Sequence, residues 1–333
     1  MRVLHVVPGL DAVGNGIAVA ASLIVAEQGA DLVEARLFAR GEGELDGYDE
    51  VWVHSCWLPM TLKSCCRVLR AGKPLVRMTH ANLDPVRLKF HGWKKWLVGP
   101  IERWCLRRCD RIVATCEAEA EWIRAYEPRV KSIEVTDIKR FFNLNPVNPV
   151  NPVKKDLHLL YLGRRHPLKG LSYLETALAT YYNKWSSAPS SLAPTTACAD
   201  NPSSNPSRKA ATYYNKCPIE FRVVSDAFGD ELERVWDWCD VLVLPTLSEN
   251  FGLVVAEALE RGKCVITTDG APAWGENLSR VERVDGGMWS GYGGRLIYLK
   301  GYRDGTPEDR VRLLKSAIEN LLSRASLTPP AAK

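Results

Sequence analysis

Residues Leu242–Leu259 read LVLPTLSENFGLVVAEAL. The apolar start of this stretch predicts a buried strand that ends near Pro245, and a short polar turn then leads into a helix that begins near Phe251 and Gly252. A helix that begins at the carboxyl end of a parallel strand points its free N–H groups at the edge of the sheet where ligands bind. The stretch therefore predicts an α/β domain with an anion-binding turn.

Two glutamates lie in this stretch. Glu249 is in the polar turn, and Glu257 lies inside the predicted helix, eight residues further on. Glu249 can therefore reach a reacting group while Glu257 faces a more distant part of the same ligand. Two glutamates at this spacing are, on their own, typical of solvated acids at a helix end, but the surrounding strand, turn and helix favour a binding site.

Strand-like and helix-like segments alternate along the rest of the chain. In the first half we expect strands at 2–7, 32–39, 50–54, 74–79 and 111–115, and helices at 17–28 and 58–71. In the second half we expect strands at 157–162, 219–224, 241–245 and 264–268, and helices at 171–180, 230–239, 251–262 and from 306 onward. Such alternation predicts parallel sheets covered by helices in two domains.

A proline repeat separates the two halves. Residues 145–153 read NPVNPVNPV, and proline at every third position excludes a helix or a central strand. We therefore expect an extended linker at 145–155, between an N-terminal domain at 1–144 and a C-terminal domain at 156–333.

A second unusual stretch, at about 182–216, is rich in Ser, Pro, Ala and Asn. It is bracketed by two copies of the hexapeptide ATYYNK, at 179–184 and 211–216. A polar stretch of this length cannot bury a core, so we expect a disordered insert without a catalytic role.

A basic turn follows the first predicted strand of the second domain, where Tyr161–Gly170 read YLGRRHPLKG. Arg164 and Lys169 can both point at one diphosphate, because arginine offers a fork that matches phosphate oxygens and lysine a mobile charge. Arg165 is a weaker candidate, and a basic surface turn is the alternative.

Two further candidates follow strands of the first domain. Gly14 and Gly16 form a glycine turn, but no full GxGxxG is present, which counts against a dinucleotide cofactor. His80 lies in the run MTHAN after a predicted strand, and His54 ends another strand, where it fits a structural role as well as a site role.

The run Leu242–Leu259 resembles the glutamate-x7-glutamate motif of glycosyltransferase family 4, and the basic turn resembles that family's Gly-Arg…Lys-Gly element. The resemblance implies two Rossmann-like domains facing across a cleft, the GT-B arrangement, and a retaining transferase that uses a nucleotide sugar. It also implies that Glu249 contacts the donor sugar and that Glu257 accepts hydrogen bonds from the ribose hydroxyls.

The remaining roles also follow from this resemblance. The backbone of Asn250, Phe251 and Gly252 would hold the diphosphate of the donor, together with the side chains of Arg164 and Lys169. Gly14 and Gly16 would face the donor across the cleft, and His80 would lie next to the reacting sugar carbon, although this chain has Ala81 where the family often has glycine. We expect catalysis to involve Glu249, His80, Arg164 and Lys169.

The function implied is transfer of a hexose-type sugar from a UDP- or GDP-sugar to a glycan or lipid-linked acceptor, in lipopolysaccharide or cell-surface polysaccharide synthesis. Arg164, Lys169 and the helix N-terminus can stabilise the leaving diphosphate, and no acidic DxD-like cluster occurs, so we expect neither a metal nor another cofactor. No nucleic acid partner is expected. The alternatives are a catalytically impaired nucleotide-sugar-binding protein, and an epimerase or phosphorylase on the same fold.

Composition bears on location. No stretch approaches the roughly 20 apolar residues of a membrane span, and the apolar run at the N-terminus is too short for a signal peptide, so we expect a cytoplasmic protein. The ten cysteines lack the spacing of a zinc site and are expected to be structural.

The net charge of +5 has a local source. Eight Lys or Arg and two acids lie between Arg87 and Arg111, where Trp and Phe are interleaved with the basic residues. This pattern suits an anionic membrane surface or a lipid-linked acceptor. The alternative is that residues at helical spacing, such as Trp96, Ile101 and Cys105, face the core of the domain.

Overall fold

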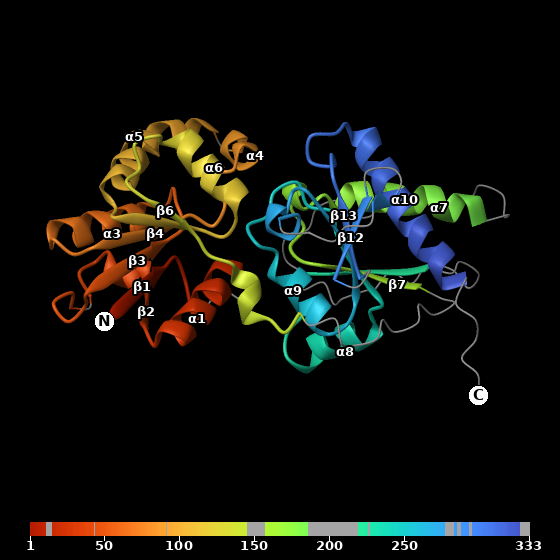
Figure 1. The fold of residues 1–333 in the computed structure, drawn as a ribbon, viewed down its shortest axis with the longest axis horizontal. Coiled ribbons are helices and arrows are strands. Elements are labelled where there is room, and N and C mark those ends of the chain that lie inside the picture. Colours follow the sequence, from red (N-terminus) through yellow and green to blue (C-terminus); the bar gives the residue numbers. More distant parts are fainter. Residues whose placement is uncertain are drawn as a thin grey trace, which may run out of the picture.

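The computed structural model describes residues 1–10, 15–42, 44–90, 92–144, 157–185, 219–225, 227–276, 283–284, 288–292 and 295–326. These residues form two α/β domains, each built around its own sheet (Figure 1). The predicted linker at 145–155, Gly14 and residues 186–216 of the predicted insert lie outside the described residues. None of the helices within the described ranges has the length and apolar character needed to cross a membrane.

The N-terminal domain contains a six-stranded parallel sheet in the order β2-β1-β3-β4-β5-β6. Its strands are β1 (Val3–Val7), β2 (Asp31–Glu34), β3 (Glu50–His54), β4 (Leu75–Met78), β5 (Arg111–Ala114) and β6 (Ile133–Val135). Its helices are α1 (Gly16–Gln28), α2 (Ala35–Phe38), α3 (Pro59–Arg70), α4 (Pro85–Lys89), α5 (Gly92–Arg108) and α6 (Glu117–Tyr126), followed by the 3-10 turn η1 (Ile138–Phe141). The central strands β1 and β4 are buried throughout, as expected for a parallel sheet with helices on both faces.

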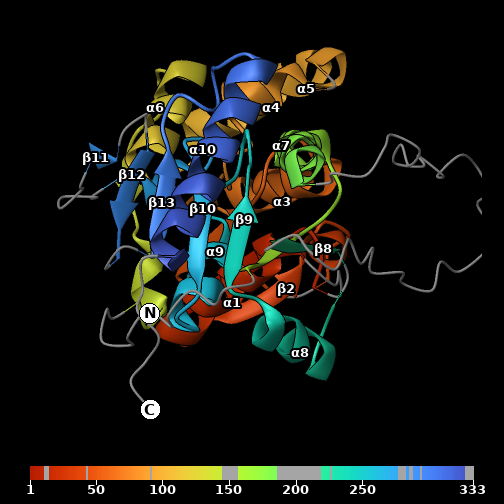
Figure 2. The same cartoon turned by 90° about the vertical axis from the view of Figure 1, so that its right-hand side faces the viewer.

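The C-terminal domain contains a seven-stranded sheet in the order β11-β12-β13-β10-β9-β7-β8, in which only β12 runs antiparallel to its neighbours. Its strands are β7 (Leu157–Leu162), β8 (Ile219–Val224), β9 (Val241–Leu244), β10 (Cys264–Thr268), β11 (Arg283–Val284), β12 (Met288–Gly291) and β13 (Leu296–Leu299). Its helices are α7 (Leu171–Trp185), α8 (Asp230–Trp238), α9 (Leu253–Glu260) and α10 (Pro307–Ser326), with 3-10 turns η2 (Pro167–Lys169) and η3 (Pro272–Trp274). Helices α7 and α10 pack together over this sheet (Figure 2).

Three expectations about elements were wrong in part. The strand expected at 32–39 ends at Glu34, because Ala35 and Phe38 are both buried at helical spacing and form α2 instead. Helix α7 continues through the first copy of ATYYNK into the start of the predicted insert, since the Tyr182 side chain packs on the core of the domain. Helix α9 begins two residues later than expected, at Leu253.

The cysteines within the described ranges are all free thiols, and every one except Cys66 is buried. Cys56 and Cys65 lie beside a buried ion pair between Arg77 of β4 and Glu102 of α5, whose Nη2 and Oε1 atoms are 2.7 Å apart. This pair attaches α5 to the sheet.

We expect Glu102→Ala to lower the free energy of unfolding by about 3–5 kcal/mol, because it leaves the buried Arg77 charge without its partner. Urea unfolding followed by circular dichroism measures this change. Glu121→Ala, at an exposed position of α6, is the matched control and should cost little. A loss below about 1 kcal/mol for Glu102→Ala would mean that the pair does not hold α5 in place.

Candidate active site

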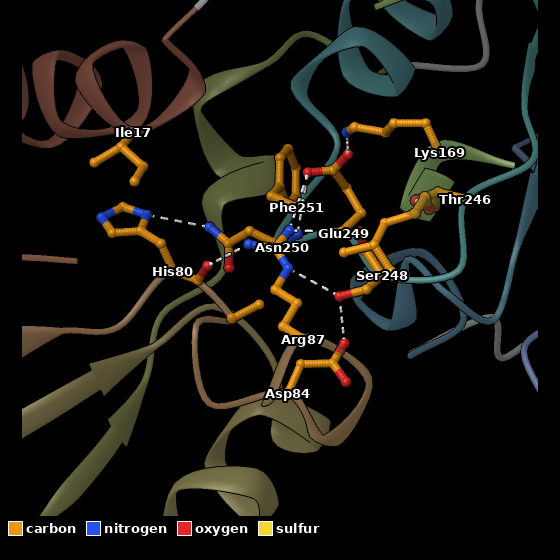
Figure 3. Close-up of polar contacts among 12 residues, drawn as sticks. Ile17, His80, Asp84, Arg87, Lys169, Thr246, Ser248, Glu249, Asn250 and Phe251 are labelled. Carbon is orange, nitrogen blue, oxygen red and sulfur yellow. Dashed lines mark hydrogen bonds and ion pairs between the residues drawn. The ribbon is translucent and has the colours of Figure 1, made fainter. Parts of the chain in front are cut away.

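The two domains meet where strands of both sheets end. Residues that follow β4 and β5 in the N-terminal domain contact the turn that follows β9 in the C-terminal domain. Ligands of parallel α/β sheets bind at this edge. The site is therefore built from both domains, and its centre is the turn that contains Ser248, Glu249 and Asn250 (Figure 3).

Glu249 lies among donors from both domains. Its Oε2 atom pairs with Lys169 Nζ, and its Oε1 atom accepts a hydrogen bond from the backbone N–H of Asn250 at 3.2 Å. Arg87 of α4 brings its Nη2 atom to 4.0 Å from Oε1. The backbone N–H of Glu249 donates to Gly270 O at 2.7 Å, which fixes the turn. Glu249 and Lys169, which the sequence assigned to different parts of one donor, thus lie in contact.

Lys169 is positioned by a close approach of two backbones. Gly170 has a left-handed φ of 67°, and a Cβ atom at this position would lie 1.9 Å from Pro245 O. Only glycine allows the basic turn to lie against the end of β9 in this way. The Leu247 N–H donates to Leu168 O at 2.7 Å and joins the two turns.

The charge of Lys169 is sensitive to its neighbours. Burial, followed by the nearby Arg87 and Arg164 guanidinium groups, lowers the pKa of Lys169 to about 7, while its contact with Glu249 acts in the opposite direction. The Arg164 side chain is therefore close enough to act on the same point. Its backbone carbonyl accepts a hydrogen bond from Tyr161 at 2.8 Å.

Arg87 is a site residue that the sequence analysis did not single out. Its Nε atom donates to Ser248 Oγ at 2.9 Å across the domain contact, and Ser248 donates in turn to the buried Asp84. Arg303 of the C-terminal domain pairs with the other oxygen of Asp84 at 2.5 Å. The sequence shows Arg87 three positions after Asp84, which caps α4, but no pattern in the sequence indicates that Ser248 is its partner.

His80 lies in the same contact between the two domains. Its Nδ1 atom is 3.2 Å from the Asn250 amide, and the other end of that amide is 3.0 Å from Thr115 Oγ1. His80 and Ala81 have φ values of 53° and 55°, a left-handed conformation that costs a non-glycine residue about 1–3 kcal/mol. The alanine that replaces the family's glycine therefore adopts a backbone conformation that suits glycine.

The buried carboxylate of Glu119 stabilises this strained turn. It accepts hydrogen bonds from Thr79 Oγ1 at 2.6 Å and from the Ala81 N–H at 2.5 Å. The N–H and hydroxyl of Thr115 both lie 2.8 Å from its other oxygen. Glu119 thus joins the end of β4 to the end of β5.

The remaining predicted residues surround this centre. Gly252 is the cap of α9 with φ 72°, and the Phe251 ring is buried against Trp274, whose indole N–H donates to Phe251 O. Gly16 begins α1 and lies opposite Leu253, the first residue of α9. Glu257 lies on α9, but its carboxyl has no hydrogen bond or ion pair to any described residue; burial raises its pKa.

Two protein-family models match the chain, one in each domain. A model described as Glycosyl transferase 4-like domain matches residues 11–136, and one described as Glycosyl transferases group 1 matches residues 156–285. A search of curated protein sequences found no match.

Three solved structures are similar to the chain. Sucrose-phosphate synthase from Thermosynechococcus elongatus has a TM-score of 0.58 and 14% identity, over 98% of this chain and 91% of that one. Lipopolysaccharide outer core galactosyltransferase WaaB has a TM-score of 0.47 and 13% identity, over 98% and 95% of the two chains. TarM has a TM-score of 0.45 and 11% identity, over 83% and 50%. At such identities, the likeness to the synthase bears on the fold alone.

Two Rossmann-like domains joined at the ends of their parallel strands define the GT-B class, which confirms the fold predicted from the sequence. The two matched ranges take in most of the chain. The chain therefore belongs to the group 1 glycosyltransferases, with a Glycosyl transferase 4-like domain at its N-terminal end.

We expect a nucleoside diphosphate that pairs with Lys169 to bind more weakly as the pH rises above about 7, by up to about tenfold per pH unit. Lys169 is protonated below its pKa and neutral above it, and the neutral amine cannot pair with a diphosphate. A bound diphosphate raises this pKa, so binding above pH 7 takes up a proton. Calorimetric titration in buffers of different ionisation enthalpy measures the uptake.

Lys169→Arg is the matched variant, because arginine stays charged over this range. It should remove both the proton uptake and the loss of affinity. Uptake that persists in this variant would assign the titration to another group.

Proposed function

We propose that the protein is a retaining transferase that moves a hexose-type sugar from a UDP- or GDP-sugar to a glycan or lipid-linked acceptor, in lipopolysaccharide or cell-surface polysaccharide synthesis. The observation that supports this most is the convergence of Arg87, Lys169 and Glu249 at one point of the domain contact. Group 1 family membership supports the general reaction.

The Glu249 carboxylate occupies the place of an anionic ligand. It accepts from Lys169 and from the Asn250 N–H, and it faces Arg87. A diphosphate carries more negative charge and offers more acceptor oxygens, so it would take over these donors. Glu249 would then be released to contact the sugar attached to that diphosphate.

The difficult step of such a transfer is departure of the nucleoside diphosphate while positive charge develops on the sugar. Lys169, Arg87 and Arg164 supply cationic groups at the leaving diphosphate, and one preorganised donor of this kind contributes about 3–4 kcal/mol. Since these groups can supply the charge that a divalent cation supplies elsewhere, we propose transfer without a metal cofactor. EDTA is then expected to leave the rate unchanged.

A panel of UDP-, GDP- and ADP-sugars, scored for nucleotide release with and without glycan acceptors, tests the proposal. We expect Glu249→Ala, Lys169→Ala, Arg164→Ala and Arg87→Ala each to lower turnover at least about 100-fold, because each removes a preorganised group. Arg165→Ala is the matched control, since its side chain pairs with Glu175 on the outside of α7. Full activity in the four site variants would contradict the assignment.

The same experiment separates the alternatives. An impaired nucleotide-sugar-binding protein would bind a donor without releasing nucleotide. An epimerase would convert the sugar without an acceptor, and a phosphorylase would require phosphate. Nuclear magnetic resonance of the product determines whether the anomeric configuration is retained.

We further propose that the surface of α5 contacts the anionic inner face of the cytoplasmic membrane. Trp93, Trp96, Leu97 and Ile101 are 66%, 78%, 58% and 50% exposed, so the apolar stripe of this helix faces outward. The alternative interpretation, in which Trp96 and Ile101 face the core, is therefore wrong for these two residues, while Cys105 does face the core.

Basic residues flank this stripe. Lys89, Lys94 and Arg108 are exposed, and the Lys94 ammonium lies 5.5 Å from the Trp93 ring centroid. Aromatic rings at the headgroup layer with charges toward anionic lipid are typical of interfacial helices. Each basic residue near such a surface contributes about 1 kcal/mol.

We expect the protein to sediment with phosphatidylglycerol vesicles at low salt, and to remain in solution with phosphatidylcholine vesicles or at high salt. Trp93→Ser with Trp96→Ser should abolish sedimentation, because it removes the inserting rings. Phe228→Ser, an exposed aromatic of the other domain, is the matched control. Absence of binding to anionic vesicles at low salt would make a soluble acceptor surface the better interpretation of α5.

A further inference from the structure

Three histidines form an unbroken hydrogen-bonded chain inside the N-terminal domain. His5 lies in β1, His54 ends β3, and His80 follows β4, so the rings step across three neighbouring strands. His5 Nδ1 is 2.9 Å from His54 Nε2, and His54 Nδ1 is 2.8 Å from His80 Nε2. No ring is more than 1% exposed.

Amide side chains close both ends. The Oε1 atom of the Gln28 amide, at the exposed end of α1, lies 2.8 Å from His5 Nε2. The Asn250 amide of the C-terminal domain lies 3.2 Å from His80 Nδ1. The row of hydrogen-bonded histidines therefore runs from the surface of the N-terminal domain to its contact with the C-terminal domain.

Every ring in the chain is neutral near pH 7. Burial lowers the pKa of His5 to about 4 and that of His80 to about 3, and it lowers the pKa of His54 well below its usual value. A neutral imidazole has one N–H donor and one acceptor nitrogen. Adjacent rings must pair a donor with an acceptor, so all three share one tautomer: either all carry the proton on Nδ1, or all on Nε2.

Thr115 selects between these two arrangements. Its hydroxyl lies 2.8 Å from Glu119 Oε2 and 3.0 Å from Asn250 Oδ1, which gives one proton two acceptors. The Glu119 carboxylate is the nearer and the stronger acceptor, and its three other donors leave one of its roughly four acceptor sites open, so the Thr115 proton belongs to it.

A half turn of the Asn250 amide removes the conflict, because Oδ1 and Nδ2 exchange places. The amide nitrogen then donates to Thr115, and the amide oxygen accepts from His80 Nδ1–H. His54 Nδ1–H then donates to His80, and His5 Nδ1–H donates to His54. The exposed Gln28 amide, whose Oε1 atom faces His5 Nε2, makes the same half turn, so that its nitrogen donates to His5. Both nitrogens of every ring then have a matching partner.

We propose that His5 and His54 are positioning residues which, with Thr115 and Asn250, hold His80 as its Nδ1–H tautomer. A ligand oxygen that replaces the Asn250 amide oxygen then meets His80 as a neutral hydrogen-bond donor. The ligand oxygen in question belongs to the nucleotide sugar, and in this respect the inference rests on the proposed function. His80 has no free base nitrogen at the domain contact in this arrangement, since its Nε2 atom accepts from His54.

Long-range ¹H–¹⁵N correlation spectra of histidine-labelled protein distinguish protonated from unprotonated ring nitrogens. We expect Nδ1–H for His5, His54 and His80 in the protein without ligand, with assignments from single histidine substitutions. Nε2–H for His80 would overturn the proposal. The readout needs no sugar donor, so inactivity in the donor panel would refute the transferase and leave the tautomer chain standing.

Two substitutions test whether the rings act together. Thr115→Val removes the selecting hydroxyl, and all three rings should then show mixed tautomers, whereas Thr115→Ser should keep the wild-type spectrum. Gln28→Glu offers only an acceptor to His5 at an exposed position that tolerates substitution, and it should shift all three rings toward Nε2–H.

A change confined to the nearest ring in either variant would overturn the coupling. If Thr115→Val does not fold, Gln28→Glu alone tests whether the rings are coupled. This variant is expected to fold, because glutamate has the size of glutamine and the position is exposed. Gln28→Ala is its control: it removes the end partner without imposing a direction, and the spectra should remain those of the wild type.

Discussion

The buried carboxylate of Glu119 is the contact on which the arrangement of the site depends. Four donors from the ends of β4 and β5 converge on its two oxygens, and they are what makes a left-handed conformation tolerable at His80 and Ala81. Such strained residues persist only where their surroundings overdetermine them. Because Thr115 belongs to the same set of donors and also meets Asn250, one buried charge fixes both the histidine and the place where the other domain touches it.

Polar contacts from several residues join the two domains at the site. Asp84 is the centre of one group, since it accepts from Ser248 and pairs with Arg303, both of the C-terminal domain. Contacts between domains are usually more polar than a domain core, and relative movement of domains is the default expectation. Arg87 joins the two roles, because the residue that bridges the domains also faces Glu249. Assembly of the site and approach of the domains are therefore one event.

Local patterns in the sequence predicted the elements well where they are continuous and apolar. The strands at 50–54, 157–162 and 264–268 have the expected bounds, because a largely buried strand shows itself in consecutive apolar residues. The partly buried strand at 219–224 also has the expected bounds. Lys169 and Glu249 were each singled out because each belongs to a turn with its own local signature, and the structure brings the two side chains together. Arg87 was missed because its partner Ser248 lies 161 residues away, and no spacing along the chain encodes that distance. The strand expected at 32–39 ends at Glu34, because Ala35 and Phe38 are both buried at helical spacing and the chain forms α2 there.

The repeated hexapeptide has a consequence for how this chain can vary in length. Its first copy lies within α7, where Tyr182 packs on the core and its hydroxyl donates to Ile219 O at 3.4 Å. Both copies end in the same Asn-Lys pair, so a gene lacking everything between Lys184 and Cys217 would still encode ATYYNK directly before the segment that leads into β8. Duplication or loss at this point leaves the packed helix with its own sequence. The connection between α7 and β8 is thus a place where the ancestry of the chain can add or remove residues without disturbing what the helix buries.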